Sequence, residues 1–335
     1  MVRRDFSLAL ITGAVAGLFL GALAVGPVTI PLSRIATIAL GGGSEVERLI
    51  IIDLRLPRAL LALLIGGNLG LAGAALQALL RNSLAAPDLF AAPQMAGLGA
   101  VLVLIGGGAG ALSYCLPAAA VLGALISVGI LIGVAGRQAS LSVLILSGFG
   151  LSAASAAATA LVMSLSANPF AILEVTFWLL GSLEDRSWRH VAMALPFIAA
   201  GSLLLLAGAP RLRTLVLGED AARSLGVDVS LLRTTIIAGT ALGVGGGVAV
   251  AGTIGYVGLV AAHLVRPIFG YDPGRLLLPS ALAGAGLLLA ADIVARLIPT
   301  QTDIKVGIIT SLIGVPFLIA AIIRERRVLG GGESA

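Results

Sequence analysis

The 335-residue chain is 59% hydrophobic and only 11% charged. Soluble domains carry about 25% charged residues, so the composition excludes an ordinary soluble protein and predicts a polytopic membrane protein. Aromatic residues make up 4% of the chain and glycine occurs 45 times, which favours closely packed helices over a β-barrel with aromatic girdles. The net charge of +5 is better explained by arginines that anchor cytoplasmic loops to anionic lipids than by binding of nucleic acid.

Few residues of this chain could support chemistry. One cysteine cannot form an internal disulfide, and two histidines without a neighbouring cysteine do not make a metal site. The single lysine, Lys305, is not part of a Walker A loop, because no Gly-Lys-Ser/Thr sequence occurs. No clustered acid, base or nucleophile indicates an active site. We therefore expect a non-enzymatic chain without metal or other cofactor, in which any uphill transport depends on a partner or an ion gradient.

Apolar runs that are long enough to cross about 30 Å of hydrocarbon recur about ten times along the chain. They predict a single all-α transmembrane domain over residues 1–335, with its longest inner polar segment near residues 214–231. The predicted spans are residues 7–26, 57–80, 88–106, 115–135, 141–164, 190–208, 233–252, 254–268, 277–297 and 305–323.

The first of these runs, residues 7–26, fixes the expected orientation. With the amino terminus in the cytoplasm, 13 of the 21 arginine and lysine residues lie inside and eight outside, as the positive-inside rule predicts. Both termini are then cytoplasmic. The same run could also be a cleaved signal peptide, because Ala22 and Ala24 stand where a cleavage site would have small residues. A retained helix better explains why the apolar run continues past them.

Two arginines stand at the outer end of the second span. Arg55 and Arg58 are three residues apart, so they share one face of a helix, and Pro57 suits its first turn. Arginines at membrane borders often extend to the interface without any further role. Near the end of the ninth span, Arg296 follows Asp292 by four residues, a spacing typical of a local ion pair worth about 0.2–0.5 kcal/mol.

Small residues follow helical spacing in two other spans. Gly66 and Gly70 form a GxxxG pattern in the second span, which is typical of helices that pack within one subunit. The fifth span carries a weakly polar stripe. Its members are Gly148, Ser152, Ser155 and Thr159. Such a stripe either allows close helix packing or lines a pathway for a bulky ligand, and the spacing alone does not separate the two.

The inner polar segment "LGEDAARSLGVDVSLLR" predicts a short surface helix. Glu219 and Asp220 suit its amino-terminal dipole, and Gly226 is a plausible stop after Leu225. A capped surface helix would need nothing more than these features.

Five stretches resemble, in the same order, the permease subunits of type II ABC importers, the family that imports vitamin B12, haem and ferric siderophores. They are "RLPRALLALLIGGNLGLAGAALQALLRNSLAAPDLF", "ARSLGVDVSLLR", "GTIGYVGLVAAHLVR", "LLLAADIVARL" and "VGIITSLIGVPFLIAAIIR". The resemblance extends from about residue 50 to residue 327. It implies a ten-helix permease in a bacterial inner membrane that forms a dimer with a second copy. It also implies two cytoplasmic ATPase subunits, which bind ATP and magnesium, and a periplasmic substrate-binding protein.

The resemblance assigns a role to the outer arginines. Arg55, Arg58 and Arg296 match positions that, in the vitamin B12 importer, face acidic residues of the binding protein. Charges of this kind mainly steer docking, and their effect fades with salt. We therefore expect these three residues to dock the binding protein.

The resemblance also implies that the inner polar segment is a coupling helix seated in a groove of the ATPase. The contact candidates are Glu219, Ala222, Arg223, Leu225 and Gly226. The turn "RNSLAAPDLF" matches the family's NPLA(D/E)P turn, whose asparagine and leucine help to close the cytoplasmic gate, so Asn82 and Leu84 are gate candidates. Ser83 and Ala86 depart from this pattern, which has proline and an acid there. The fifth span is expected beside the central pathway at the dimer interface.

The remaining histidine in these motifs, His263 of "GLVAAHLVRP", is more typical of a structural residue near a helix end than of a haem or metal ligand. The leading interpretation is a passive pathway subunit for an iron complex, either a ferric siderophore or haem. A vitamin B12 permease of the same family is the alternative. A stand-alone secondary transporter would need buried ionisable residues or helices broken in matching halves, and neither stands out in the sequence.

Overall fold

The structure is a computed structural model that describes residues 2–106, 114–136, 141–299 and 304–330, and over this part of the chain every regular element is helical. The long helices are α1 (Val2–Ala24), α4 (Leu56–Leu79), α6 (Cys115–Ala135), α7 (Leu141–Ser164), α9 (Trp188–Leu215), α11 (Val229–Ala251), α13 (Pro273–Leu297) and α14 (Val306–Gly330). The short helices are α2 (Leu32–Ala39), α3 (Glu45–Arg48), the π-helix η1 (Leu49–Arg55), the 3-10 turn η2 (Pro87–Phe90), α5 (Ala92–Ile105), α8 (Pro169–Leu179), α10 (Glu219–Ser224) and α12 (Val257–Phe269).

The ten predicted spans correspond to the eight long helices together with α5 and α12. Eight helices of the described residues are long and apolar enough to cross a membrane, and α3, η1 and α4 run on as one of them. The prediction of an all-α chain with about ten membrane helices is thus confirmed. Helices α2 and α8 had no counterpart among the predicted spans.

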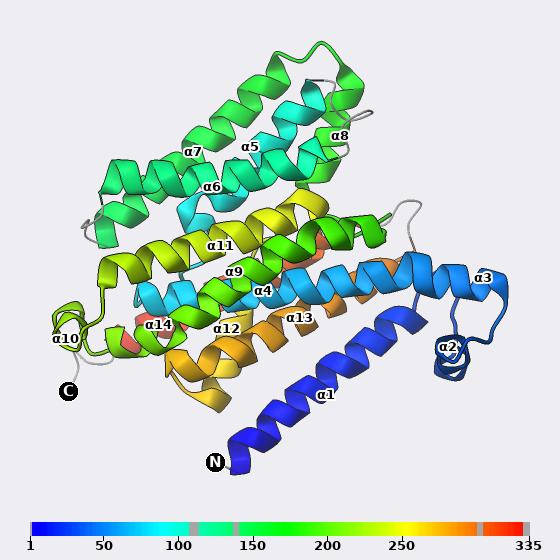
Figure 1. The fold of residues 1–335 in the computed structure, drawn as a ribbon, viewed down its shortest axis with the longest axis horizontal. Coiled ribbons are helices and arrows are strands. Elements are labelled where there is room, and N and C mark those ends of the chain that lie inside the picture. Colours follow the sequence, from blue (N-terminus) through cyan, green and yellow to red (C-terminus); the bar gives the residue numbers. More distant parts are fainter. Residues whose placement is uncertain (1, 107–113, 137–140, 300–303, 331–335) are drawn as a thin grey trace.

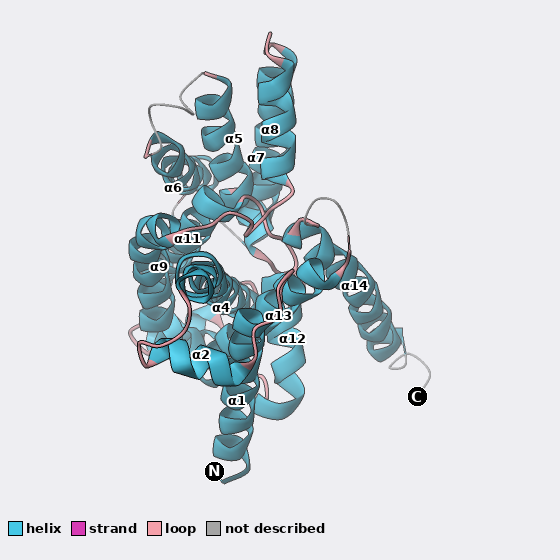
Figure 2. Ribbon diagram, turned by 90° about the vertical axis from the view of Figure 1, so that its right-hand side faces the viewer, coloured by secondary structure: helices cyan, strands magenta, loops and turns pink. Residues whose placement is uncertain are grey.

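Helix α4 lies at the centre of the fold. Seen end-on in Figure 2, it has α9 and α11 on one side and α13 on the other, and it also packs against α12. A Cβ on Gly66 would lie 2.4 Å from the Gly284 carbonyl oxygen, and one on Gly70 would lie 2.1 Å from that of Ser280. Only glycine allows α4 and α13 to approach so closely, which confirms the packing role predicted for this GxxxG pair.

Two of the spans are too short to cross the membrane as helices. Helices α5 and α12 have 14 and 13 residues, or about 20 Å at 1.5 Å per residue, against about 30 Å of hydrocarbon. Irregular backbone precedes each of them, at residues 86–91 and 252–256. Irregular backbone at membrane depth is tolerated only where protein buries it or a cavity hydrates it. These two segments therefore mark the interior of the protein.

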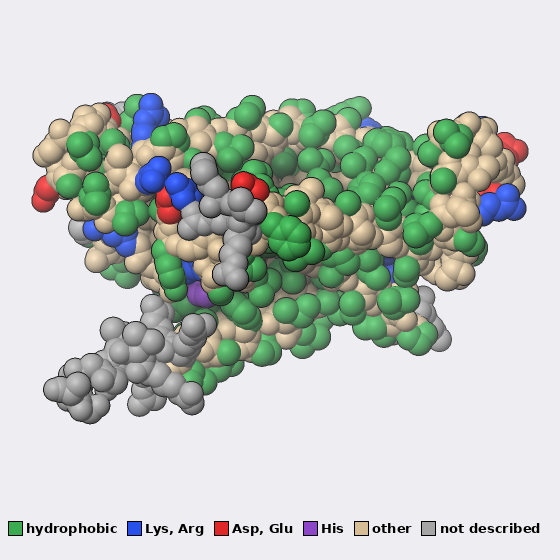
Figure 3. Space-filling view, turned by 90° about the horizontal axis from the view of Figure 1, so that it is seen from below, with side chains coloured by type: hydrophobic (Ala, Val, Ile, Leu, Met, Phe, Trp, Pro, Cys, Tyr) green, Lys and Arg blue, Asp and Glu red, His purple; other side chains and the backbone are tan. Residues whose placement is uncertain are grey.

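The polar groups gather at the two ends of the long axis. Helix α10 lies at one end, and α2 and α3 lie at the other (Figure 1). The space-filling view shows charged side chains mainly at these ends and hydrophobic side chains along the band between them (Figure 3). The segment that could also have been a signal peptide is, in the structure, helix α1, which packs against α13. The chain is thus arranged as a multi-pass membrane protein.

Candidate functional site

The guanidinium group of Arg55 caps the end of α1. Its Nη1 donates to the carbonyl oxygens of Leu23 at 2.8 Å and Ala24 at 2.9 Å, and its Nη2 donates to that of Val28. The last carbonyls of a helix have no intrahelical partner and carry partial negative charge, so a cation is favourable there. Arg55 ends the π-helix η1 and is only 7% exposed. It points into the protein rather than toward the membrane interface.

Asp292 joins the other two arginines of this end. Its Oδ1 lies 2.8 Å from Nε of Arg58, and its Oδ2 lies 2.8 Å from Nη2 of Arg296, an ion pair without hydrogen-bond geometry. Asp292 is completely buried. Nη1 of Arg296 also donates to the carbonyl oxygens of Ala22 at 2.8 Å and Val25 at 2.9 Å. The local pair expected from sequence spacing is therefore part of a buried network that ties α1, α4 and α13 together.

These contacts limit the docking role expected for the three arginines, which stays a prediction. The side chains of Arg58 and Arg296 are 14% and 5% exposed, so Arg58 offers the most surface to a partner. Burial lowers the pKa of the nearby Arg186 guanidinium, Asp185 opposes that shift, and Arg58 adds to it. Arg58 and Arg186 are therefore close enough to interact, but acidic residues accompany both, Asp292 at Arg58 and Asp185 at Arg186.

At the opposite end, α10 ends as the sequence predicts. The amide of Val227 donates to the carbonyl of Ala222 at 3.0 Å, and that of Gly226 donates to the carbonyl of Arg223 at 2.9 Å. This is the hydrogen-bond pattern of a Schellman motif, and Gly226 takes the left-handed conformation that it requires, with φ +82°. The predicted stop after Leu225 is confirmed.

Two of the coupling candidates attach α10 to the body of the protein. Glu219 pairs with Arg223 at 3.3 Å and also with the buried Arg233 of α11. Ala222 has no exposed surface. In this structure Ala222 therefore packs α10 in place and does not present a surface to a partner, which departs from the contact role expected for it.

This end also exposes large apolar side chains. Leu225 is 62% exposed, and Val216 and Leu217 at the end of α9 are 57% and 69% exposed. We call these three residues the coupling patch. Large exposed apolar groups at a polar end of a membrane protein indicate contact with another chain. Sequence reasoning missed Val216 and Leu217, although two branched apolar residues directly before "GED" were the available signal.

The turn after α4 is locally built by Asn82. Its Oδ1 accepts a hydrogen bond from the amide of Leu84 at 2.9 Å, which is an Asx turn. Leu84 lines a large cavity, whereas Asn82 is exposed and lies outside the cavity lining. The gate role of the two residues stays a prediction, and the structure gives the cavity-facing position to Leu84.

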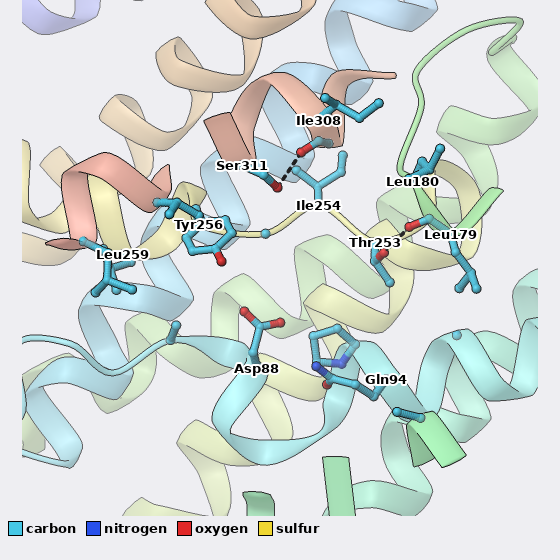
Figure 4. A pocket seen from close by; sticks show the side chains of 18 of the residues that line it. Asp88, Gln94, Leu179, Leu180, Thr253, Ile254, Tyr256, Leu259, Ile308 and Ser311 are labelled. Carbon is cyan, nitrogen blue, oxygen red and sulfur yellow. Dashed lines mark hydrogen bonds between the residues drawn. The ribbon is translucent and has the colours of Figure 1, made fainter. Parts of the chain in front are cut away.

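The cavity has a volume of about 1190 Å³ and lies between α5, α7, α12 and α14 and the two irregular segments. Drug-sized ligands occupy pockets of about 300–1,000 Å³, so this space suits a bulkier molecule. Its walls are mainly aliphatic (Figure 4). The polar lining residues are Asp88, Gln94, Thr159, Thr253, Tyr256 and Ser311.

The stripe on α7 divides between the two roles that the sequence left open. A Cβ on Gly148 would lie 1.9 Å from the Leu89 carbonyl oxygen, so this glycine lets η2 pack on α7. Ser152 Oγ donates to the Asp88 carbonyl at 3.1 Å. Ser155 is buried, and Thr159 lines the cavity. The first three residues of the stripe therefore have packing contacts in this structure, Thr159 faces the cavity, and the pathway role of the stripe stays a prediction.

His263 has the surroundings of a structural residue. Its Nδ1 lies 3.1 Å from the Leu259 carbonyl oxygen, and its ring meets that of Phe317 edge to face at 5.6 Å. Within the described residues, no group of three or more His, Cys, Asp or Glu side chains is placed to hold a metal ion.

The chain is similar to known proteins over most of its length. The model of the FecCD transport family matches residues 14–324. The uncharacterized ABC transporter permease protein YvrB of Bacillus subtilis is 37% identical over 307 residues, which cover 88% of this chain and 84% of the relative. The cobalamin import system permease protein BtuC of Halobacterium salinarum is 36% identical over 296 residues, covering 86% and 76%. A solved structure described as an inward-facing ABC transporter of metal-chelate type has a TM-score of 0.86 and 28% identity, covering 96% of this chain and 99% of that chain.

Proposed function

The chain belongs to the FecCD transport family as a permease of an ABC importer, and on this premise we propose that two copies form the conduit for a bulky metal chelate. The cavity of about 1190 Å³ is the observation that carries this proposal. Its borders α7 and α14 expose large apolar side chains, among them Phe149 at 67% and Leu312 at 67%. A second copy that covers these faces would close the cavity into a symmetric pathway.

The energy for transport comes, in this proposal, from two cytoplasmic ATPase subunits that bind ATP and magnesium. The coupling patch and the exposed Arg223 are the surface available to them, while Glu219 and Ala222 hold α10 in register with α9 and α11. A short helix fixed at both ends transmits displacement to the helices that it joins. This end then faces the cytoplasm together with both termini, and the membrane is a bacterial inner membrane.

A periplasmic binding protein delivers the chelate at the opposite end. The buried network around Asp292 keeps this end rigid, and Arg58, which is more exposed than Arg296, supplies a positive charge that orients an acidic partner. This restricts the docking role to the exposed edge of the arginine group. Arg55 and Arg296 support that edge from behind.

The first candidate for the cargo is a corrinoid, because several of the relatives are named as cobalamin or vitamin B12 permeases. An iron complex, either a ferric siderophore or haem, is the second candidate, since the solved neighbour is described only as a metal-chelate transporter. The mainly aliphatic walls of the cavity suit either class of bulky chelate.

Reconstitution in liposomes tests the function. The permease with its cognate ATPase and binding protein should take up cyanocobalamin, or a ferric hydroxamate for the second candidate, only with ATP inside and binding protein outside. The permease alone should neither hydrolyse ATP nor transport. Uptake by the permease alone, driven by a proton or sodium gradient, would instead establish the secondary transporter and overturn the proposal.

A further inference from the structure

Asp88 is the single acidic residue between Asp53 and Glu174 in the sequence, and the structure places it at the cavity. Among the lining residues of the described chain, it is the one with an acidic or basic side chain. Asp88 is an exposed residue in this structure, so its side chain is accessible from the cavity. Its surroundings show how it is held.

The turn that carries Asp88 is rigid. Pro87 begins η2, and Ala91 ends it in a left-handed conformation at φ +58°, which is unfavourable for a residue with a side chain. The turn is seated on α7 by the close approach at Gly148 and by the hydrogen bond from Ser152 to the Asp88 carbonyl. The side chain is left to face the cavity.

The opposite wall presents a second constrained polar residue. Tyr256 has φ +66°, a left-handed backbone that is rare for an aromatic residue. Its side chain packs on α14 where Gly314 leaves space, since a Cβ there would lie 2.2 Å from Cβ of Tyr256. Figure 4 shows the Tyr256 hydroxyl and the Asp88 carboxylate directed toward one another from the two walls.

Gln94, in the first turn of α5, completes this group. Its side chain lines the same cavity as Asp88. Its Oε1 is buried at the cavity without a hydrogen-bond partner in the structure. Thr253 and Ser311, by contrast, already donate to carbonyl oxygens of Leu179 and Gly307. The hydroxyl hydrogens of Thr253 and Ser311 are thus engaged, and the carboxylate of Asp88 and the unpaired Oε1 of Gln94 are the stronger acceptors open to a cargo.

We propose that Asp88, with Gln94 beside it and Tyr256 opposite, is the charge-selective contact of the conduit. It favours neutral or cationic chelates that carry N–H donors, such as primary amide groups, over chelates that carry free carboxylates. This inference rests on the proposed function and names the chemistry of its cargo. In a dimer, each copy contributes one such carboxylate to the same pathway.

The effect expected from one charge is measurable. A carboxylate of the cargo about 6 Å from Asp88 in a hydrated conduit meets repulsion that lowers its passage by about threefold. An amide at the same place meets no such repulsion and can donate to the free acceptors. The selectivity should therefore follow the charge of this wall, and not only its shape.

The test is uptake by proteoliposomes that contain the complete importer and its binding protein. The probes are cyanocobalamin and its monocarboxylate derivative, in which one peripheral amide is hydrolysed. Comparing the ratio of their uptake between variants cancels the preference of the binding protein. Asp88→Asn should raise the relative uptake of the carboxylate probe about threefold, and Gln94→Glu should lower it. Asp5→Asn, the same change at an exposed site on α1, is the matched control and should leave the ratio unchanged.

The outcomes separate the two proposals. If the wild type transports and both variants leave the ratio at the wild-type value, the charge-selective contact is refuted and the import function stands. If the wild type imports neither these probes nor a ferric hydroxamate, the proposed function falls and this inference falls with it. Because the two variants shift the ratio in opposite directions, either one decides the question if the other does not assemble with the ATPase.

Discussion

Neutralising Asp292 should destabilise the protein more than any other single loss of charge at its two ends. The carboxylate is completely buried and lies 2.8 Å from both Arg58 and Arg296. Asp292→Asn keeps the shape of the side chain and removes the charge. Two buried guanidinium groups then remain without their counter-ion.

The size of the effect follows from burial. Removing one partner of a buried ion pair costs about 3–5 kcal/mol, because the remaining charge is neither hydrated nor paired. The carbonyls of Ala22 and Val25 still accept from Arg296, so the loss should stay within that range. At about 2–4 °C per kcal/mol, the melting temperature should fall by about 6–20 °C.

The same helix supplies the matched control. Asp272, at the start of α13, also contacts two arginines, Arg213 at 3.3 Å and Arg275 at 3.5 Å, whose side chains are 62% and 55% exposed. Exposed pairs of this kind contribute about 0–1 kcal/mol, and asparagine still caps the helix. Asp272→Asn should therefore lower the melting temperature by less than about 3 °C.

The assay is the thermal unfolding of the purified full chain in one detergent, followed by fluorescence-detected size exclusion. A second test is the double variant Asp292→Asn with Arg58→Gln. It removes one of the two guanidinium groups left without a counter-ion, so it should restore about 1–2 kcal/mol of the free energy of unfolding. Equal shifts for Asp292→Asn and Asp272→Asn, or a double variant no more stable than Asp292→Asn alone, would refute the reasoning.

Three other predictions concern the cavity and the two ends. Gly148→Ala should displace η2 and cost about 1–3 kcal/mol, because its Cβ would lie 1.9 Å from the Leu89 carbonyl oxygen. Gly150→Ala, which meets nothing within 4 Å, should be neutral or stabilising in the same thermal assay. Leu225→Glu should reduce copurification of the ATPase at least tenfold, whereas Leu40→Glu, 89% exposed near the opposite end, should not. The association rate of the binding protein, measured by surface plasmon resonance, should fall as the salt concentration rises. An unchanged rate would exclude electrostatic steering.

The membrane helices were predictable because apolar runs of spanning length are a property of composition along the chain. The short spans were not. Hydropathy placed span starts at residues 88 and 254, but α5 and α12 begin at Ala92 and Val257. The intervening residues are nearly as apolar as a helix, so only tertiary packing reveals that their backbone is irregular.

The direction of the outer arginine side chains could not be predicted from the sequence either. Spacing showed that Arg55 and Arg58 share a helix face, and that Asp292 and Arg296 are close enough to pair. It did not show that the end of α1, more than 25 residues before Arg55, offers unpaired carbonyls to that face. Contacts between residues this far apart depend on the packing of α1 against α13, which periodicity does not encode.

Asp88 shows the same limit at the cavity. The family pattern has an acid before the proline of this turn, and here Ala86 occupies that position while an acid follows the proline instead. The departure was visible, but its consequence was not, because the turn's seat on α7 at Gly148 joins segments about 60 residues apart.

The two ends of the molecule hold their charges in different ways, and this bears on how the conduit moves. Asp292 is completely buried and, with its two arginines, fixes α1, α4 and α13 to one another, whereas Glu219 pairs with the exposed Arg223 of α10 and with the buried Arg233 of α11. Breaking the contact to Arg233 would leave a buried charge unpaired, so α10 should move together with α11. Helix α7 carries both Thr159 and the seat of the Asp88 turn, so a movement of α7 changes the polar contact and the width of the cavity together. Opening at one end and release of the cargo would then be one event.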